Sequence, residues 1–254
     1  MKYTSPALSF SDQADLLIKR GLNGNKSALV SILKSVSYYR FQEYCYPYKD
    51  SSGQFKSDSS LEQIWGTYIF DRQLRLSIMD GIERVETALK TDVAYLHSHK
   101  YGPFGFLSQQ NLPNLSTQWH QDFLDKIRAE TDRSKEPFVI AFFRDHGDQH
   151  DYLPVFRVTD IMSFGNIFTF FRGLESKDKK QIASRYNIKA PVLSSWIMTL
   201  NYIRNLCAHH GRLYNRILAI KPYIPDSRNN PEWHNPGTIS NYRLFSVVSL
   251  LQYM

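Results

Sequence analysis

The sequence has few cysteines and no long apolar run, and both absences narrow the classes of protein to consider. Its 254 residues include two cysteines, Cys45 and Cys207, too few for the disulfide framework of a secreted protein or for a cysteine-rich zinc site. No stretch approaches the roughly 18 consecutive apolar residues of a membrane span. The first ten residues lack the basic and apolar regions of a secretory signal. We therefore expect a cytoplasmic protein without membrane association, with both thiols reduced and buried.

Signatures of cofactor-dependent chemistry are also missing. The sequence contains no glycine-rich phosphate loop, no Ser-His-Asp order and no Cys-X-X-Cys pair. The run FFRDHGDQHDYLP at 142–154 is dense in Asp and His, which could bind a divalent metal. However, its glycine and proline predict a surface loop, and its spacing matches no known ligand set. We expect no metal and no small-molecule cofactor.

Helical periodicity dominates, without tandem repeats, low-complexity tracts or strand-like alternation. It predicts helices over 12–21, 26–36, a long segment from Ser59 or Ser60, 117–131, 136–145, 161–172, 176–186 and 191–220, followed by an amphipathic segment at the end. The fold class is therefore all-α, with one globular unit. We divide it into an N-terminal helical and aromatic extension (1–58) packed on a helical domain (59–254).

Polar residues on or near the long helix have structural interpretations. Asp71 and Arg75 share its apolar stripe and predict a partly buried ion pair, which we favour over a catalytic carboxylate. His97 and His99 are expected to cap the helix or to lie in solvent. The aromatic turn SYYRFQEYCYPY is expected to pack on the core, although its rings could stack on bases.

Basic residues are concentrated at the C-terminal end of the chain. The formal net charge is +7, and residues 185–254 hold eight Lys and Arg against two acidic residues, which is an excess of +6. Such a segment either binds a polyanion, because phosphates attract it irrespective of sequence, or is a solvated basic face.

The segment RNLCAHHGRLYNR (204–216) places two histidines side by side. Projected on one continuous helix, His210 joins an apolar stripe with Ile203, and His209 lies on the opposite, polar face. We therefore predict a buried, neutral His210 and an exposed His209. An imidazole can accept and donate protons near neutral pH, so His209 is the better catalytic candidate. The rest of the apolar stripe is Trp196, Leu200, Cys207 and Tyr214, and the polar face adds Asn201, Asn205, Arg212 and Arg216.

Arg204 lies about 140° from His209 on the same projection. One straight helix therefore does not direct both side chains at one atom unless the long arginine side chain bends around it. Two copies meeting across a two-fold axis would bring two arginines and two histidines to one phosphate. A homodimer is expected for this reason.

Residues 204–209 resemble the Arg-X4-His motif, with a polar second residue, of HEPN-type ribonucleases. Several blocks, in order, are similar to the Abi-like family of bacterial phage abortive-infection proteins, of the AbiD/AbiF type. These blocks are SYYRFQEYCYPY, YIFDRQLRLSIMDGIERVETALKTDVAYL, KYGPFGFL, LPVFRVTDIMSFGNI and SSWIMTLNYIRNLCAHHGRLYNR.

The resemblance implies a dimeric, HEPN-like helical bundle that cleaves RNA without a metal. Arg204 would hold the scissile phosphate, His209 would be the general acid or base, and Asn205 would orient it. His210 is the second choice, because Arg-X5-His also fits a loosely drawn motif. The products would be 2′,3′-cyclic phosphate and 5′-hydroxyl ends, since the ribose 2′-hydroxyl is the nucleophile. Additional RNA contacts are assigned to Arg185, Arg212, Arg216 and Lys221.

Two other functions remain open at this point. The same fold could hold a structured small RNA as partner or regulator without cleaving it. Alternatively, it could be an interaction protein that only dimerises. Salt dependence separates them, because phosphate contacts always weaken as salt increases.

Overall fold

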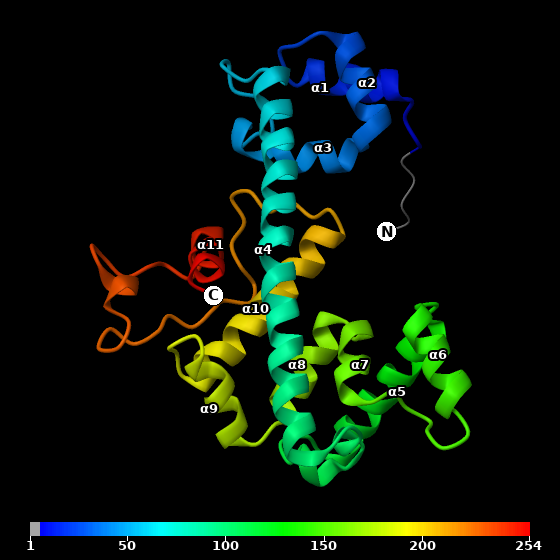
Figure 1. Cartoon of the computed structure of the whole chain (residues 1–254). Coiled ribbons are helices and arrows are strands. Elements are labelled where there is room, and N and C mark those ends of the chain that lie inside the picture. The colour runs from blue at the N-terminus through cyan, green and yellow to red at the C-terminus, as the bar shows by residue number, and fades with distance from the viewer. Residues whose placement is uncertain (1–5) are drawn as a thin grey trace. The chain divides into compact units, whose positions relative to one another are not determined.

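The computed structural model describes residues 6–254, in which all regular secondary structure is helical and no β-strand occurs. The expected all-α fold class is thus confirmed (Figure 1). Residues 1–5, part of the stretch without a secretory signal pattern, lie outside the described residues. The α-helices are α1 (Phe10–Lys19), α2 (Lys26–Val36), α3 (Tyr38–Cys45), α4 (Leu61–Tyr101), α5 (Thr117–Arg133), α6 (Pro137–His146), α7 (Val155–Ile161), α8 (Phe164–Gly173), α9 (Ser176–Ser184), α10 (Ala190–Ala208) and α11 (Leu244–Tyr253).

The chain divides into two compact units. Unit 1 extends to Ser77 and includes His210–Tyr214, whereas unit 2 comprises Ile78–His209 and Asn215–Met254. Helix α4 contributes to both units. The two adjacent histidines also belong to different units, His209 to unit 2 and His210 to unit 1. The domain boundary after residue 58 stays a prediction.

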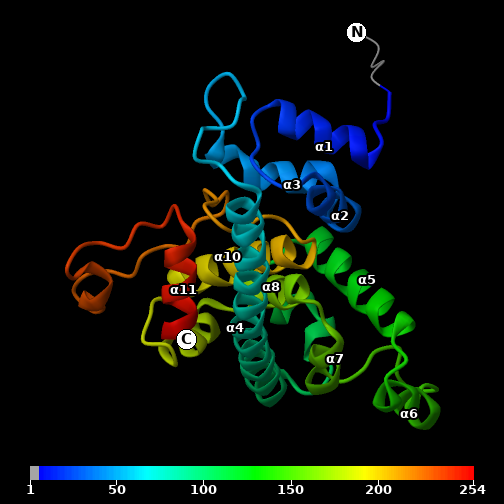
Figure 2. The ribbon, with the colours of Figure 1, turned by 90° about the horizontal axis from the view of Figure 1, so that it is seen from above.

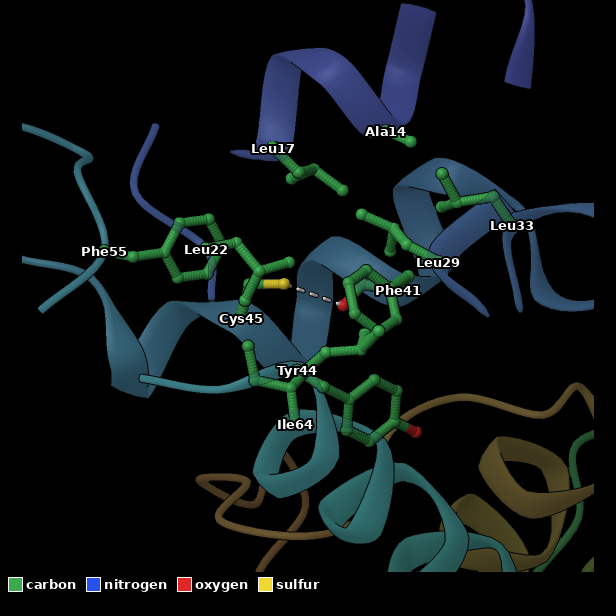
Figure 3. Packing of buried hydrophobic residues seen from close by; sticks show 11 residues of the cluster. Ala14, Leu17, Leu22, Leu29, Leu33, Phe41, Tyr44, Cys45, Phe55 and Ile64 are labelled. Atoms are coloured by element: carbon green, nitrogen blue, oxygen red, sulfur yellow. Dashed lines mark hydrogen bonds between the residues drawn. The ribbon is translucent and has the colours of Figure 1, made fainter. Parts of the chain in front are cut away.

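Unit 1 has its own apolar core, formed by α1, α2, α3 and the start of α4 (Figure 3). The aromatic segment expected to be a turn is instead α3, and its buried residues Phe41, Tyr44 and Cys45 recur at helical spacing. Burial raises the pKa of the Cys45 thiol to about 12, and its Sγ donates to the Phe41 carbonyl. Both Cys45 and Cys207 are buried reduced thiols, as predicted.

Helix α4 begins with a reciprocal cap. The Gln63 amide donates to Ser60 Oγ (3.3 Å), and the Ser60 amide donates to Gln63 Oε1 (2.9 Å). This capping box satisfies two backbone donors at the helix start, which confirms the expected N-terminus. The apolar stripe of α4 is buried in unit 2 at Ile78, Ile82, Val85, Leu89 and Val93.

Helix α10 is central to unit 2, where it packs against α8, α9 and α11 (Figures 1 and 2). Trp196 is fully buried. Its ring centre lies 5.2 Å from that of Trp233, and its ring contacts Tyr253 edge-on. Its indole Nε1 donates to the Tyr223 carbonyl (2.8 Å), so a buried polar group keeps a partner. These contacts fix α10 from one side, and Asn205 and His209 on its polar face are exposed.

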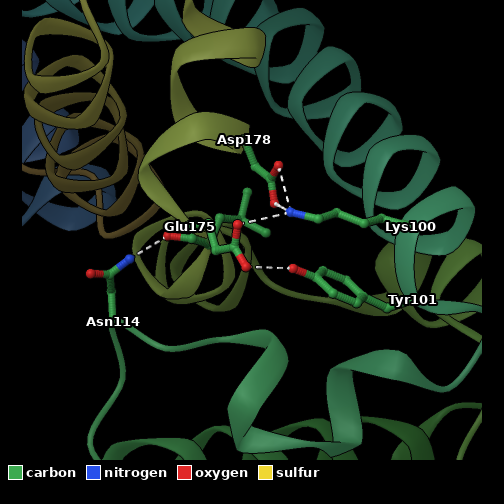
Figure 4. Close-up of polar contacts among 6 residues, drawn as sticks. Lys100, Tyr101, Asn114, Glu175 and Asp178 are labelled. Atoms are coloured by element: carbon green, nitrogen blue, oxygen red, sulfur yellow. Dashed lines mark hydrogen bonds and ion pairs between the residues drawn. The ribbon is translucent and has the colours of Figure 1, made fainter.

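A polar cluster joins the end of α4 to the start of α9 within unit 2 (Figure 4). Lys100 Nζ lies 2.9 Å from Glu175 and 3.0 Å from Asp178, and the Tyr101 hydroxyl donates to Glu175 (2.9 Å). His97, one turn earlier, is fully buried rather than capping or solvated, and neither ring nitrogen has a hydrogen-bond partner among the described residues. His97 instead packs against the rings of Tyr101 and Phe170.

The predicted helices differ from the observed ones mainly at their ends. Helix α2 matches its prediction residue for residue, whereas α7 was not predicted and α10 ends 12 residues before the predicted residue 220. Across residues 6–254, no helix combines the length and the apolar character needed to cross a lipid bilayer.

Candidate functional site

The candidate motif occupies the last turn of α10, in unit 2. Pro191 lies in the first turn, where its missing N–H costs no hydrogen bond. The buried face of the helix carries Trp196, Leu200, Ile203 and Cys207. On the opposite side Asn205 is exposed and His209 is exposed at the helix end. The predicted exposure of His209 is therefore confirmed.

Arg204 and Asn205 contact each other directly. The Arg204 guanidinium donates to Asn205 Oδ1 (3.4 Å), although the two residues are neighbours separated by about 100° around the helix. The arginine side chain therefore bends towards the face that carries Asn205. The backbone amide of His209 donates to the Asn205 carbonyl (3.0 Å), so residues 205 and 209 are successive positions on that face. An arginine, an amide and an imidazole thus belong to one turn of helix.

The histidine at 210 is exposed, and its predicted burial is wrong. Helix α10 ends at Ala208, His209 is its C-cap, and His210 has a left-handed φ of 58°. Residues beyond this point no longer follow the helical projection. Leu213 is the buried side chain of the following segment, whereas Tyr214, expected in the apolar stripe, is 38% exposed.

The segment after the helix is held by a carboxylate of its own unit, unit 1. Asp71 Oδ1 accepts from the backbone amides of Leu213 (3.0 Å) and Tyr214 (2.5 Å). In a continuing helix these two amides would donate to the carbonyls of residues 209 and 210. The carboxylate replaces those acceptors, so the chain can leave the helix without burying unpaired amides. The helical projection holds only for a helix that continues past residue 208, where α10 ends.

The other oxygen of Asp71 has two partners of its own. Tyr44 donates its hydroxyl to Oδ2 (2.5 Å), and the Arg75 guanidinium also binds this oxygen. Asp71 is 0% and Arg75 is 6% exposed, so the ion pair is fully rather than partly buried. Burial, followed by the hydrogen bond to Asp71, raises the pKa of Tyr44. Because Asp71 is buried and its oxygens are occupied, it cannot contact a macromolecular substrate.

The predicted RNA-contacting residues differ in their surroundings. Arg185 forms an ion pair with Asp92, which neutralises part of its charge, while Arg212 and Arg216 are half-buried. Lys221 is exposed and lies 4.0 Å from the centre of the Tyr242 ring. Their role in binding RNA stays a prediction.

Arg243 was not selected from the sequence, although it belongs to the basic segment. Its guanidinium donates to both the carbonyl and the side-chain oxygen of Asn215 (3.1 Å each) within unit 2. The same part of the chain contains Lys189, which is paired with Asp226 (2.8 Å). The pKa of Asp226 is lowered to about 2, first by its hydrogen bond with Lys189. Only the net charge of the segment signalled these residues.

In the described part of the chain, residues 6–254, no group of three or more His, Cys, Asp or Glu side chains is arranged to hold a metal ion. The Asp- and His-rich run at 142–154 begins in α6, where Asp145 is paired with Arg144 (2.7 Å). His150 stacks on Phe104, with 4.3 Å between the ring centres. These side chains thus have other partners.

A comparison with protein families matches the model described as Abi-like protein over residues 31–215. The match includes α10, both histidines and the Asp71 cluster. No curated protein and no solved structure is significantly similar to the chain.

Proposed function

Because the chain belongs to the Abi-like protein family, we propose that it is an endoribonuclease of phage defence that acts by abortive infection. In this proposal it cleaves RNA without a metal and has the HEPN-type fold and the AbiD/AbiF-type character suggested by its sequence. Cleavage of RNA inside the infected cell would stop phage production together with growth of the host.

The observation that supports the proposal most is the composition of the last turn of α10. It combines an exposed imidazole at 209, the Asn205 amide and the Arg204 guanidinium, which bends towards Asn205. Phosphodiester cleavage by an internal hydroxyl needs a proton acceptor, a proton donor and positive charge near the phosphorus. These three residue types supply all of them.

In the proposed reaction the ribose 2′-oxygen attacks the adjacent phosphorus while a neutral imidazole takes its proton. The bond from phosphorus to the 5′-oxygen breaks, and an imidazolium protonates the leaving oxygen. Arg204 stabilises the negative charge of the phosphorane, and Asn205 orients His209. The products are a 2′,3′-cyclic phosphate and a 5′-hydroxyl, and no water is consumed. His210 is retained as the second choice for the imidazole that acts.

A dimer is part of the proposal, because one reaction needs a base and an acid at the same time. His209 of two protomers would supply both if two copies of α10 met around one phosphate. Variants with only one functional histidine per dimer would then lose most of their activity.

Further contacts with RNA are assigned to Arg212, Arg216, Lys221 and Arg185. Lys221 is expected to contribute most, since it is exposed and lies against an exposed aromatic ring that could stack on a base. Arg185 is expected to contribute least, because Asp92 already binds its guanidinium.

The test is cleavage of an end-labelled RNA pool in the presence of EDTA by the wild type, Arg204→Ala and His209→Ala. Wild-type cutting that both substitutions abolish, with unchanged circular dichroism, supports the proposal. Tight binding of one RNA species without cleavage would replace it with the non-catalytic RNA-holding function. Activity that survives His209→Ala would reject the assigned role.

A further inference from the structure

The segment directly after the motif has a backbone conformation that needs support. His210 has a φ of 58° and is exposed, so its own side chain buries little surface that could compensate for the strain. A non-glycine residue in this left-handed region is uncommon, and it persists where the surrounding structure determines it. The contacts that determine it are found in unit 1.

Asp71 provides these contacts from the first half of α4. Its Oδ1 accepts from both amides at 213 and 214, and its Oδ2 is bound by Tyr44 and Arg75. One carboxylate thus links the chain after the motif to two other elements. Leu213 is fully buried beside this cluster, and Tyr214 packs edge-on against Phe70 (5.8 Å).

We infer that Asp71 is a positioning residue that fixes the segment His210–Tyr214, which follows directly after the candidate motif in the chain. This inference rests on the proposed function. Its basis is that the two oxygens of Asp71 bind different partners. Oδ2 binds Tyr44 and Arg75, whereas Oδ1 accepts from two consecutive backbone amides, which an ion pair with Arg75 alone would not require. Asp71 acts through the backbone and does not touch the substrate.

Loss of this acceptor releases the segment, because the amides of Leu213 and Tyr214 then lack the carboxylate and are not part of a helix that could replace it. Small displacements of reacting groups lower the rate of the chemical step more than they weaken binding, with losses on the order of 100-fold. A variant without the Asp71 carboxylate is therefore expected to lose about 10- to 100-fold in kcat with little change in KM.

The test compares two variants that differ in what they leave at position 71 with a control variant that keeps Asp71. Asp71→Leu with Arg75→Met removes both charges together, because a buried arginine without its carboxylate would destabilise the fold. Asp71→Asn keeps a neutral oxygen acceptor and serves as the conservative variant. Tyr44→Phe is the matched control, since it removes a partner of Oδ2 but leaves the two bonds to Oδ1.

Three measurements are made on each variant: hydrogen exchange of the amides at 213 and 214, the NMR chemical shifts of the His209 and His210 ring protons, and RNA cleavage. We expect exchange protection and kcat to fall in the order wild type, Asp71→Asn, double variant, with Tyr44→Phe close to the wild type. The chemical shifts of the imidazole ring protons are expected to change in the double variant. If the double variant fails to fold, Asp71→Asn and Tyr44→Phe still give the comparison.

Unchanged protection and unchanged imidazole chemical shifts in the Asp71 variants would overturn the inference, and so would loss of protection with undiminished kcat. Failure of the proposed function has a different signature. If the wild type cleaves no RNA, the nuclease is refuted, while hydrogen exchange and the imidazole chemical shifts still decide whether Asp71 fixes the segment.

Discussion

Glycine and alanine should have opposite effects on stability at the two adjacent histidines. His210 has a left-handed φ of 58°, whereas His209 has a φ of −87°. Both side chains are exposed, so removing either imidazole loses little packing. The difference in stability between the Gly and Ala variants at each position therefore reports the free-energy cost of the backbone conformation there.

The magnitude follows from two opposing contributions. The left-handed conformation costs a residue with a Cβ about 1–2 kcal/mol, and glycine loses about 0.5–1 kcal/mol more conformational entropy on folding. At 210 the first contribution exceeds the second, so His210→Gly should be more stable than His210→Ala by about 1 kcal/mol. At 209 only the entropy remains, so His209→Ala should be the more stable variant by about 0.5–1 kcal/mol.

Thermal and urea unfolding of the four variants, followed by circular dichroism, measures both differences. A difference of 1 kcal/mol corresponds to about 2–4 °C in Tm for a chain of this size. RNA cleavage on the same samples separates the candidates, since both variants at 210 should cut and both at 209 should not. If alanine equals or exceeds glycine at 210, the backbone argument is refuted. Cleavage that is lost at 210 and kept at 209 would transfer the catalytic role to His210.

Two other predictions concern unit 2. Burial lowers the pKa of His97 to about 4, so between pH 6.5 and 4 the unfolded chain binds a proton that the folded chain does not. The stabilisation is complete above about pH 6.5 and is lost as the pH falls towards 4, by up to ~3 kcal/mol. Urea unfolding across this range should show a shallower pH dependence for His97→Met, and equal slopes would contradict the burial argument. Lys221→Ala should weaken RNA binding several-fold and reduce the salt slope by about 0.7. Arg185→Ala, measured by the same salt titration, should do less because of its pairing with Asp92; the reverse order would contradict the assignment.

The helical fold could be predicted from the sequence because apolar periodicity and caps are local. Ser60 and Gln63 form the capping box that starts α4, and α2 has the predicted bounds. Helix α3 was missed because its aromatic residues resemble a turn region, whereas its burial depends on the remainder of unit 1. Periodicity indicates which face is apolar, but it does not identify what covers that face.

In the candidate site, too, the local pattern predicts the faces of the helix but not the contacts made by distant residues. His209 and Asn205 lie on the predicted polar face because α10 is helical up to residue 208. His210 was misplaced because the helix ends where a carboxylate 142 residues away in the sequence accepts the amide of Leu213. No local pattern in residues 204–216 contains that information, so the sequence alone could not predict the end of the helix.

Cleavage of a single RNA oligonucleotide tests the central claim most directly. The substrate is prepared with ribose or 2′-deoxyribose at the cleaved position, and both forms are incubated in EDTA with the wild type and with His209→Ala. The account predicts that only the wild type cuts, only the ribose form is cut, and the new ends are 2′,3′-cyclic phosphate and 5′-hydroxyl. Cutting of the deoxy form, or undiminished cutting by His209→Ala, would contradict it.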